Sequence, residues 1–322
     1  MRPMAKTPGG FRAALLIGWI ALSAAGILYA RVRGIPSWAA LPVLAAFLVE
    51  YPFYLVMGFP SVRERFTGLA LHAFLVASAA LPYLACCCGA IRFQWASLLQ
   101  LSALALALSL WFVVLPAVPA VDLAFLALLP AVLLGRYFDT IYPAPYKGVD
   151  LIILGHLALI QIGVMTLLVG RRVHESGFGF WPNGNDWWIG ARHFLYFLPI
   201  GFPLALLLKA MRFAGPAPLW KIAALFTGFL WVVALSEEFL FRGVLLEWVE
   251  GWTASRNAAL LLTSVAFGLV HLGFRVFPNW RWVLMAAVLG WFCGRARIQA
   301  GSIRAGMVTH ALVFTAWQAF FV

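Results

Sequence analysis

Long apolar runs separated by short polar stretches extend along almost the whole chain. A helix of about 20 apolar residues is long enough to cross the hydrocarbon core of a bilayer. The pattern therefore predicts an all-α fold, a polytopic transmembrane helical bundle with about eleven spans and a range of eight to eleven. The expected spans are residues 13–30, 36–59, 67–91, 96–118, 119–137, 151–169, 194–212, 219–249, 257–273, 281–298 and 302–322.

The first apolar run is preceded by Arg2, Lys6 and Arg12 and is followed at once by Arg31. It is longer than the apolar core of a typical signal peptide. We interpret it as an uncleaved first membrane span, with a cleaved signal peptide as the alternative.

Composition supports the membrane assignment and limits the partners. Hydrophobic residues make up 64% of the chain and charged residues 11%, whereas about a quarter of the residues in a soluble domain are charged. The net charge of +12 comes from basic residues placed singly or in pairs between apolar runs. Such residues are typical of loop anchors on anionic lipid, so membrane lipids are expected partners and nucleic acid is not. The expected location is a bacterial inner membrane, with multiple passes.

Two interruptions organise the chain. The longest polar stretch, residues 170–193, contains Trp181, Trp187 and Trp188, so we expect a loop anchored in the membrane interface, with a lid over a site as the alternative. The sequence Gly-Pro-Ala-Pro at 215–218 marks a predicted domain boundary. Residues 1–215 form a multi-span region of unassigned role, and residues 216–322 form a four-helix core.

Polar groups outside the last hundred residues are scattered. Glu50, His72 and His156 lie singly within apolar surroundings, and we interpret them as packed or hydrogen-bonded structural groups. The cysteines at 86–88 are consecutive and Cys293 is alone, which is neither a disulfide framework nor the spacing of a metal site.

Two adjacent carboxylates and a guanidinium stand inside the apolar run 219–249, as Glu237-Glu238-x-x-x-Arg242. An ionisable group at membrane depth costs about 3 kcal/mol or more, so it is usually paired and functional. In a helix, Glu238 and Arg242 share a face and can form an ion pair. Glu237 points about 100° away, which leaves this carboxylate available for chemistry.

Two histidines follow on later apolar runs, His271 in Phe267-x-x-x-His271 and His310 near the carboxy terminus. At about 1.5 Å per residue along each helix, both can reach the depth of Glu237. In a water-holding cavity Glu237 would act as general base on a water, and His271 would orient that water or share its proton. His310 could donate a hydrogen bond to the oxyanion that develops.

A metal site is the alternative use of the same groups, with glutamate and histidine ligands around zinc. The pair of histidines one helical turn apart that a zinc helix typically carries is missing, so we expect no metal and no cofactor.

Over about residues 219–322 the chain resembles the CAAX-protease and bacteriocin-processing family of glutamate intramembrane endopeptidases. The family's Glu-Glu-x-x-x-Arg motif stands here at residues 237–242, its Phe-x-x-x-His motif at 267–271 and its last histidine at His310. The resemblance implies that Glu237 and His271 activate water, that Glu238 and Arg242 support the site, and that the substrate is a membrane-embedded protein or peptide. It makes residues 216–322 the protease core.

One position departs from this family. An asparagine often follows its last histidine by one turn as a second oxyanion donor, and here Phe314 takes that place. Either His310 acts alone, Thr309 or Thr315 substitutes, or the activity is altered. A non-catalytic immunity or scaffold relative therefore remains an alternative, as does a proton-coupled transporter, although the inverted repeats of a transporter are not evident.

Overall fold

The computed structural model describes residues 8–173 and 175–321. Within these residues the elements are helices, with no β-strand and a single isolated bridge between Phe213 and Phe321. The predicted all-α class is confirmed. Arg2, Lys6 and the last residue of the final expected span lie outside the described residues.

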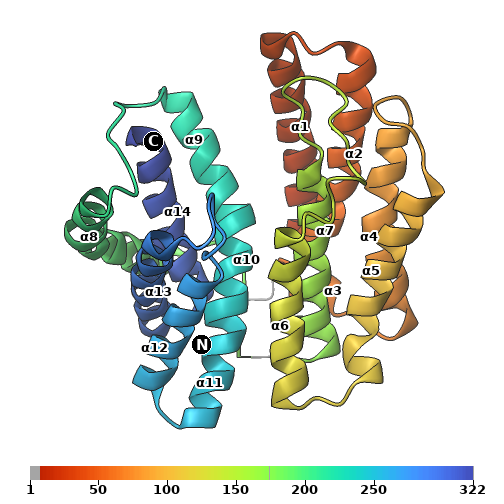
Figure 1. The fold of residues 1–322 in the computed structure, drawn as a ribbon. Coiled ribbons are helices and arrows are strands. Elements are labelled where there is room, and N and C mark those ends of the chain that lie inside the picture. Colours follow the sequence, from red (N-terminus) through yellow and green to blue (C-terminus); the bar gives the residue numbers. More distant parts are fainter. Residues whose placement is uncertain (1–7, 174, 322) are drawn as a thin grey trace. The chain divides into compact units, whose positions relative to one another are not determined.

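Contacts divide the chain into two compact units, Met1–Arg172 and Val173–Val322. In the first unit, α2 packs against α1, α4 and α7, and α4 packs against α5 (Figure 1). The helices of this unit are α1 (Pro8–Arg33), α2 (Ser37–Val56), α3 (Pro60–Arg63), α4 (Leu69–Cys87), α5 (Trp95–Val114), α6 (Pro119–Leu134), α7 (Ile152–Met165) and the π-helical η1 (Thr166–Gly170).

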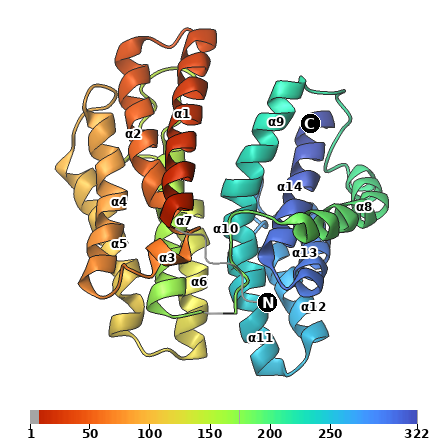
Figure 2. The ribbon, with the colours of Figure 1, turned by 180° about the vertical axis from the view of Figure 1, so that it is seen from behind.

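The second unit is built around one long helical rod. Figure 2 shows α9, α10 and α11 following one another with α14 beside them, and α14 contacts α9 and α10 along this rod. The elements are α8 (Gly184–Leu207), α9 (Leu219–Gly228), η2 (Phe229–Ala234), α10 (Leu235–Glu238), η3 (Phe239–Leu245), α11 (Leu246–Thr253), α12 (Arg256–Leu269), α13 (Trp280–Ala300) and α14 (Ile303–Phe320).

By its packing, α8 belongs with the second unit, because it contacts both α13 and α14. The compact unit therefore begins about forty residues before the sequence-based boundary at 215–216. That boundary concerned where the protease core begins, and it stays a prediction.

Each of the eleven expected spans coincides with helical residues. Seven of the described helices are long and apolar enough to cross a membrane: α1, α2, α4, α5, α7 with η1, α8, and the rod from α9 to α11. The helices α6 and α12 are apolar but shorter. A multi-pass helical membrane bundle is thus confirmed.

The polar interruption at 170–193 was expected to be a loop throughout, and this is wrong for its second half. Helix α8 begins at Gly184, so Trp187 and Trp188 lie on a helix. Asn183 caps this helix: its side chain accepts a hydrogen bond from the Asp186 amide, and the Asp186 carboxylate accepts one from the Asn183 amide, both at 2.9 Å. This reciprocal cap is a known start signal for helices.

Candidate active site

The two glutamates of the motif lie on a short α-helical segment between two π-helical ones. α10 contains Glu237 and Glu238, with η2 before it and η3 after it. π-Helical turns are rare and occur frequently at functional sites. The irregular backbone therefore coincides with the charged residues that the sequence marks as the site.

Glu238 and Arg242 form the ion pair that their spacing predicts. The Arg242 Nη1 atom donates to Glu238 Oε1 over 3.0 Å, and both side chains are buried, with 0% and 1% exposure for Glu238 and Arg242. The guanidinium also lies over the ring of Phe267, 4.2 Å from its centroid. A buried ion pair needs such further contacts to offset the loss of hydration.

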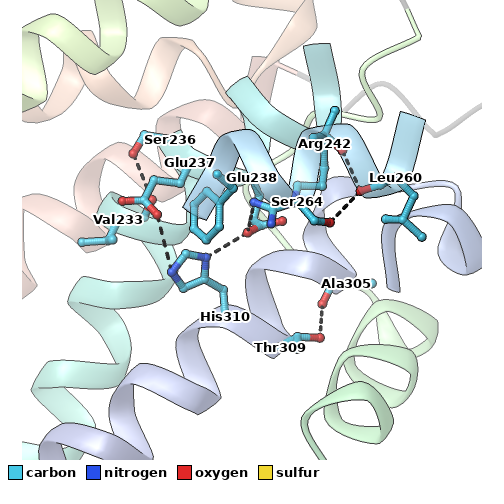
Figure 3. Close-up of polar contacts among 12 residues, drawn as sticks. Val233, Ser236, Glu237, Glu238, Arg242, Leu260, Ser264, Ala305, Thr309 and His310 are labelled. Carbon is cyan, nitrogen blue, oxygen red and sulfur yellow. Dashed lines mark hydrogen bonds and ion pairs between the residues drawn. The ribbon is translucent and has the colours of Figure 1, made fainter. Parts of the chain in front are cut away.

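His310 of α14 lies between the two glutamates (Figure 3). Its Nδ1 atom is 2.8 Å from Glu238 Oε1. An ionised carboxylate only accepts hydrogen bonds, so beside ionised Glu238 the Nδ1 atom carries the proton and donates it. The Nε2 atom is directed at Glu237, 3.7 Å from Oε2, which is longer than a hydrogen bond. Neither Nε2 nor this Oε2 has a hydrogen-bond partner among the described residues.

The two carboxylates differ in their access to solvent. The Glu237 side chain is 31% exposed, whereas Glu238 is fully buried. Glu238 is already hydrogen-bonded to Arg242 and His310, and within the described part of the chain Glu237 has only the long contact to His310. Glu237 is therefore the more exposed of the two carboxylates, although its Oε2 atom, which faces His310, is buried.

His271 lies in the turn that follows α12. Its Nδ1 atom donates to the Phe267 carbonyl oxygen over 2.8 Å, because a carbonyl can only accept. The neutral ring then keeps Nε2 as an acceptor. Phe267 contacts both imidazoles, with centroid distances of 4.9 Å to His271 and 5.8 Å to His310. Within the described part of the chain, His271 has no hydrogen bond or ion pair with either glutamate.

Phe314 faces His310, at a centroid distance of 5.0 Å, and also packs against Phe229. Of the two threonines considered as substitutes for a second oxyanion donor, Thr309 is engaged elsewhere. Its hydroxyl lies 3.0 Å from the Gly190 carbonyl of α8 and 3.1 Å from that of Ala305. The Thr315 hydroxyl is buried and has no hydrogen-bond partner among the described residues.

Sequence reasoning missed two glycines that make room for the ion pair. A Cβ atom on Gly306 of α14 would lie 2.7 Å from Glu238 Oε2 and 3.2 Å from the Cys293 carbonyl oxygen. A Cβ atom on Gly290 of α13 would lie 2.9 Å from Arg242 Nη2. The carboxylate and the guanidinium thus occupy space that a side chain would otherwise fill.

Residues 218–315 match the family model described as type II CAAX prenyl endopeptidase Rce1-like. The resemblance drawn from the motif residues is confirmed for this CAAX-protease segment, which is roughly a third of the chain. At the level of the family, the match supports a CAAX-type intramembrane protease with a membrane-associated protein substrate. No curated protein and no solved structure was found to match the chain.

A mainly apolar pocket borders the CAAX-protease segment on the side of His271. Phe267, His271 and Phe314 line it together with side chains from α8, α13 and α14, among them Trp282 and Leu289. An apolar pocket beside polar reactive groups is typical of a site that binds an apolar part of its ligand.

Within the described residues, one group in the CAAX-protease segment brings three potential metal ligands together. Donor atoms of Glu238, Cys293 and His310 lie within 4.8 Å of one another, and all three residues are buried. This is not the set of Glu237, His271 and His310 that the zinc alternative required. Glu238 Oε1 accepts hydrogen bonds from Arg242 and His310, whereas Oε2 has no hydrogen-bond partner among the described residues. A metal on Oε2 would leave the ion pair with Arg242 in place, but coordination by His310 Nδ1 would displace the hydrogen bond between His310 and Glu238.

Proposed function

We propose that the protein is a glutamate-type intramembrane endopeptidase that hydrolyses a peptide bond of a membrane-associated protein or peptide. The observation that carries the proposal is the contrast between the part-exposed Glu237 and the buried Glu238, Arg242 and His310 beside it. This cluster lies within the segment that matches the CAAX endopeptidase family.

Glu237 supplies the general base of this proposal. A carboxylate open to water takes a proton from that water, which then attacks the carbonyl carbon of the scissile peptide bond. The proton passes to the nitrogen of the departing amine when the carbon–nitrogen bond breaks. His271 assists in this proposal, because its Nδ1–H is held by the Phe267 carbonyl and its Nε2 is left to accept a proton.

His310 supplies electrostatic stabilisation. Its Nδ1–H is fixed by Glu238, and Glu238 is fixed by Arg242, so the ring is held in one orientation. When Nε2 is protonated, it presents a donor next to Glu237, where the oxyanion of the tetrahedral intermediate would form. A donor held in place before the reaction stabilises this charge without reorganisation.

A second candidate function follows from Phe314. A benzyl group next to His310 removes the second oxyanion donor, which favours a non-catalytic immunity or scaffold relative as the alternative. No observation favours the proton-coupled transporter. The location in a bacterial inner membrane stays a prediction.

The test compares the membrane-protein termini of cells that express the wild-type chain or Glu237→Gln, by proteomics. New termini that depend on Glu237, with equal amounts of both proteins in the membrane, would support the protease. Glu250→Gln is the matched control, because Glu250 of α11 pairs with Arg256 of α12, outside the cluster. Identical termini in the wild type and Glu237→Gln, followed by no cleavage of reconstituted membrane proteins, would favour the non-catalytic alternative.

A further inference from the structure

A second pocket of the second unit is lined by three cations and no acid. Lys209 follows α8, Arg275 lies in the turn between α12 and α13, and Arg281 lies in the first turn of α13. All three side chains are exposed, and among the described residues none forms an ion pair with a carboxylate. Arg275 instead lies near the rings of Phe274 and Trp317, at 5.6 and 5.5 Å from their centroids. Clustered cations without acidic partners attract an anion.

The surroundings of this basic pocket are apolar and exposed. Val276, Phe277 and Trp280 are 62%, 75% and 60% exposed. In a membrane protein, exposed apolar and aromatic side chains next to arginines are typical of the boundary between acyl chains and headgroups. The anion that reaches the three cations would therefore come from the membrane interface.

The basic pocket shares part of its wall with the apolar pocket beside His271. Ala210 and Trp282 line both. An amphipathic ligand could place its anionic group on the cations while its apolar chain follows the common wall towards Phe267 and Phe314. Neither pocket alone requires an amphipathic ligand. Because the two pockets share a wall, they favour a single molecule that carries both an anionic group and an apolar chain.

We propose that Lys209, Arg275 and Arg281 bind the phosphate of an anionic phospholipid headgroup, with one acyl chain entering the adjoining apolar pocket. The charge of the three cations complements the headgroup, and basic pockets between membrane helices are known to bind such groups. A peptide carboxylate has the same sign of charge, but it does not account for the exposed aromatic residues around the pocket. The lipid site does not depend on the proposed proteolysis.

The test measures lipid binding to the purified full-length chain in detergent, by native mass spectrometry. We expect dioleoyl phosphatidylglycerol to bind about tenfold or more tightly than dioleoyl phosphatidylcholine. The triple variant Lys209→Gln, Arg275→Gln, Arg281→Gln should lose this preference. Equal binding of the two lipids to the wild type would overturn the proposal.

A matched control removes the same charge elsewhere. Arg65, Arg92 and Lys147 are exposed cations of the first unit, and their replacement by glutamine should leave the lipid preference within about twofold of the wild type. An equal loss in both triple variants would show diffuse attraction and reject the site. If the first triple variant does not fold, Arg281→Glu alone should still lower the preference, while Arg281→Lys should keep it.

Two further probes separate the sources of the anion. Inorganic phosphate should compete only weakly with the lipid, because it lacks the acyl chain. Full displacement of phosphatidylglycerol by an equal concentration of phosphate would show that the acyl chain does not bind in the apolar pocket. A short apolar peptide is compared with its carboxy-terminal amide. Binding that requires the free carboxylate and the three cations, and that phosphatidylglycerol does not displace, would overturn the lipid assignment in favour of a peptide site.

Discussion

Phe314 lies against the imidazole of His310, with ring centroids 5.0 Å apart and ring planes inclined by 39°. A benzyl group offers no hydrogen-bond donor, so of these two residues His310 alone can stabilise an oxyanion in the proposed mechanism. The packing of these two rings therefore makes the proposed activity depend strongly on one histidine.

We expect His310→Ala to lower the cleavage rate by more than about two orders of magnitude. The reason is that removing one positioned donor costs about a hundredfold or more, and Phe314 provides no substitute. The measurement is kcat on a reconstituted substrate. His72→Ala in the first unit, where His72 contacts Ser109, is the control and should keep the rate. A loss below tenfold in His310→Ala would contradict the assigned role.

Phe314→Asn should keep the fold and raise the cleavage rate. The amide adds a donor on the same side as His310, because residues four apart share a helix face. Phe314→Leu is the control, since it also removes the ring but adds no donor. Equal rates in the two variants would show that a second donor contributes nothing here.

Arg242→Met should lower the free energy of unfolding by about 3–5 kcal/mol, because it leaves the buried Glu238 carboxylate without its cation. Adding Glu238→Gln to this variant should restore part of the loss. Arg256→Gln is the control: this guanidinium is 60% exposed in its ion pair with Glu250, and such a pair contributes at most about 1 kcal/mol. Thermal denaturation in detergent reports the changes. Equal melting temperatures of Arg242→Met and the wild type would show that the ion pair between Glu238 and Arg242 does not stabilise the fold.

Gly306→Ala should lower both thermal stability and cleavage, because its methyl group would approach Glu238 Oε2 to 2.7 Å and displace the carboxylate that holds His310. Gly228→Ala is the matched control, since a methyl group there would meet no atom within 4 Å apart from its chain neighbours and its own helix backbone. The contrast between the two substitutions separates the effect of the site from that of replacing a helical glycine. A Gly306→Ala protein with normal melting and normal activity would show that Glu238 can move freely.

Cleavage should survive exhaustive chelation if Glu237 and His271 activate water without a metal. The measurement compares activity with metal content before and after treatment with a chelator. Stoichiometric zinc that follows activity through removal and restoration would favour the metalloprotease interpretation, with Glu238, Cys293 and His310 as the ligands to examine first.

Local patterns predicted much of this fold and part of the site. The eleven apolar runs coincide with helical residues, and seven of the described helices are long and apolar enough to cross a membrane. The four-residue spacing of Glu238 and Arg242 predicted their ion pair. The contact of Glu238 with His310 joins residues 72 positions apart, and no local pattern could specify it. The catalytic roles of these residues stay predictions, since no comparison tests them.

Two other features were not predicted from the sequence, for different physical reasons. The cap formed by Asn183 and Asp186 was readable in the sequence, but tryptophans and glycines nearby favoured a loop. The clearance needed at Gly290 and Gly306 depends on how three helices pack against one another. A glycine in a membrane helix has many uses, so its type alone does not reveal which buried group lies opposite.

The glycines at positions 290 and 306 also bear on how homologues of this chain should be recognised. Gly290 of α13 and Gly306 of α14 have no Cβ, and this leaves room for the side chains of Arg242 and Glu238. We expect homologues that keep both the glutamate and the arginine of the buried pair to keep glycine at these two aligned positions. An alanine or serine at either position would identify homologues in which the glutamate and arginine side chains have moved, even where the charged residues of the motif are unchanged.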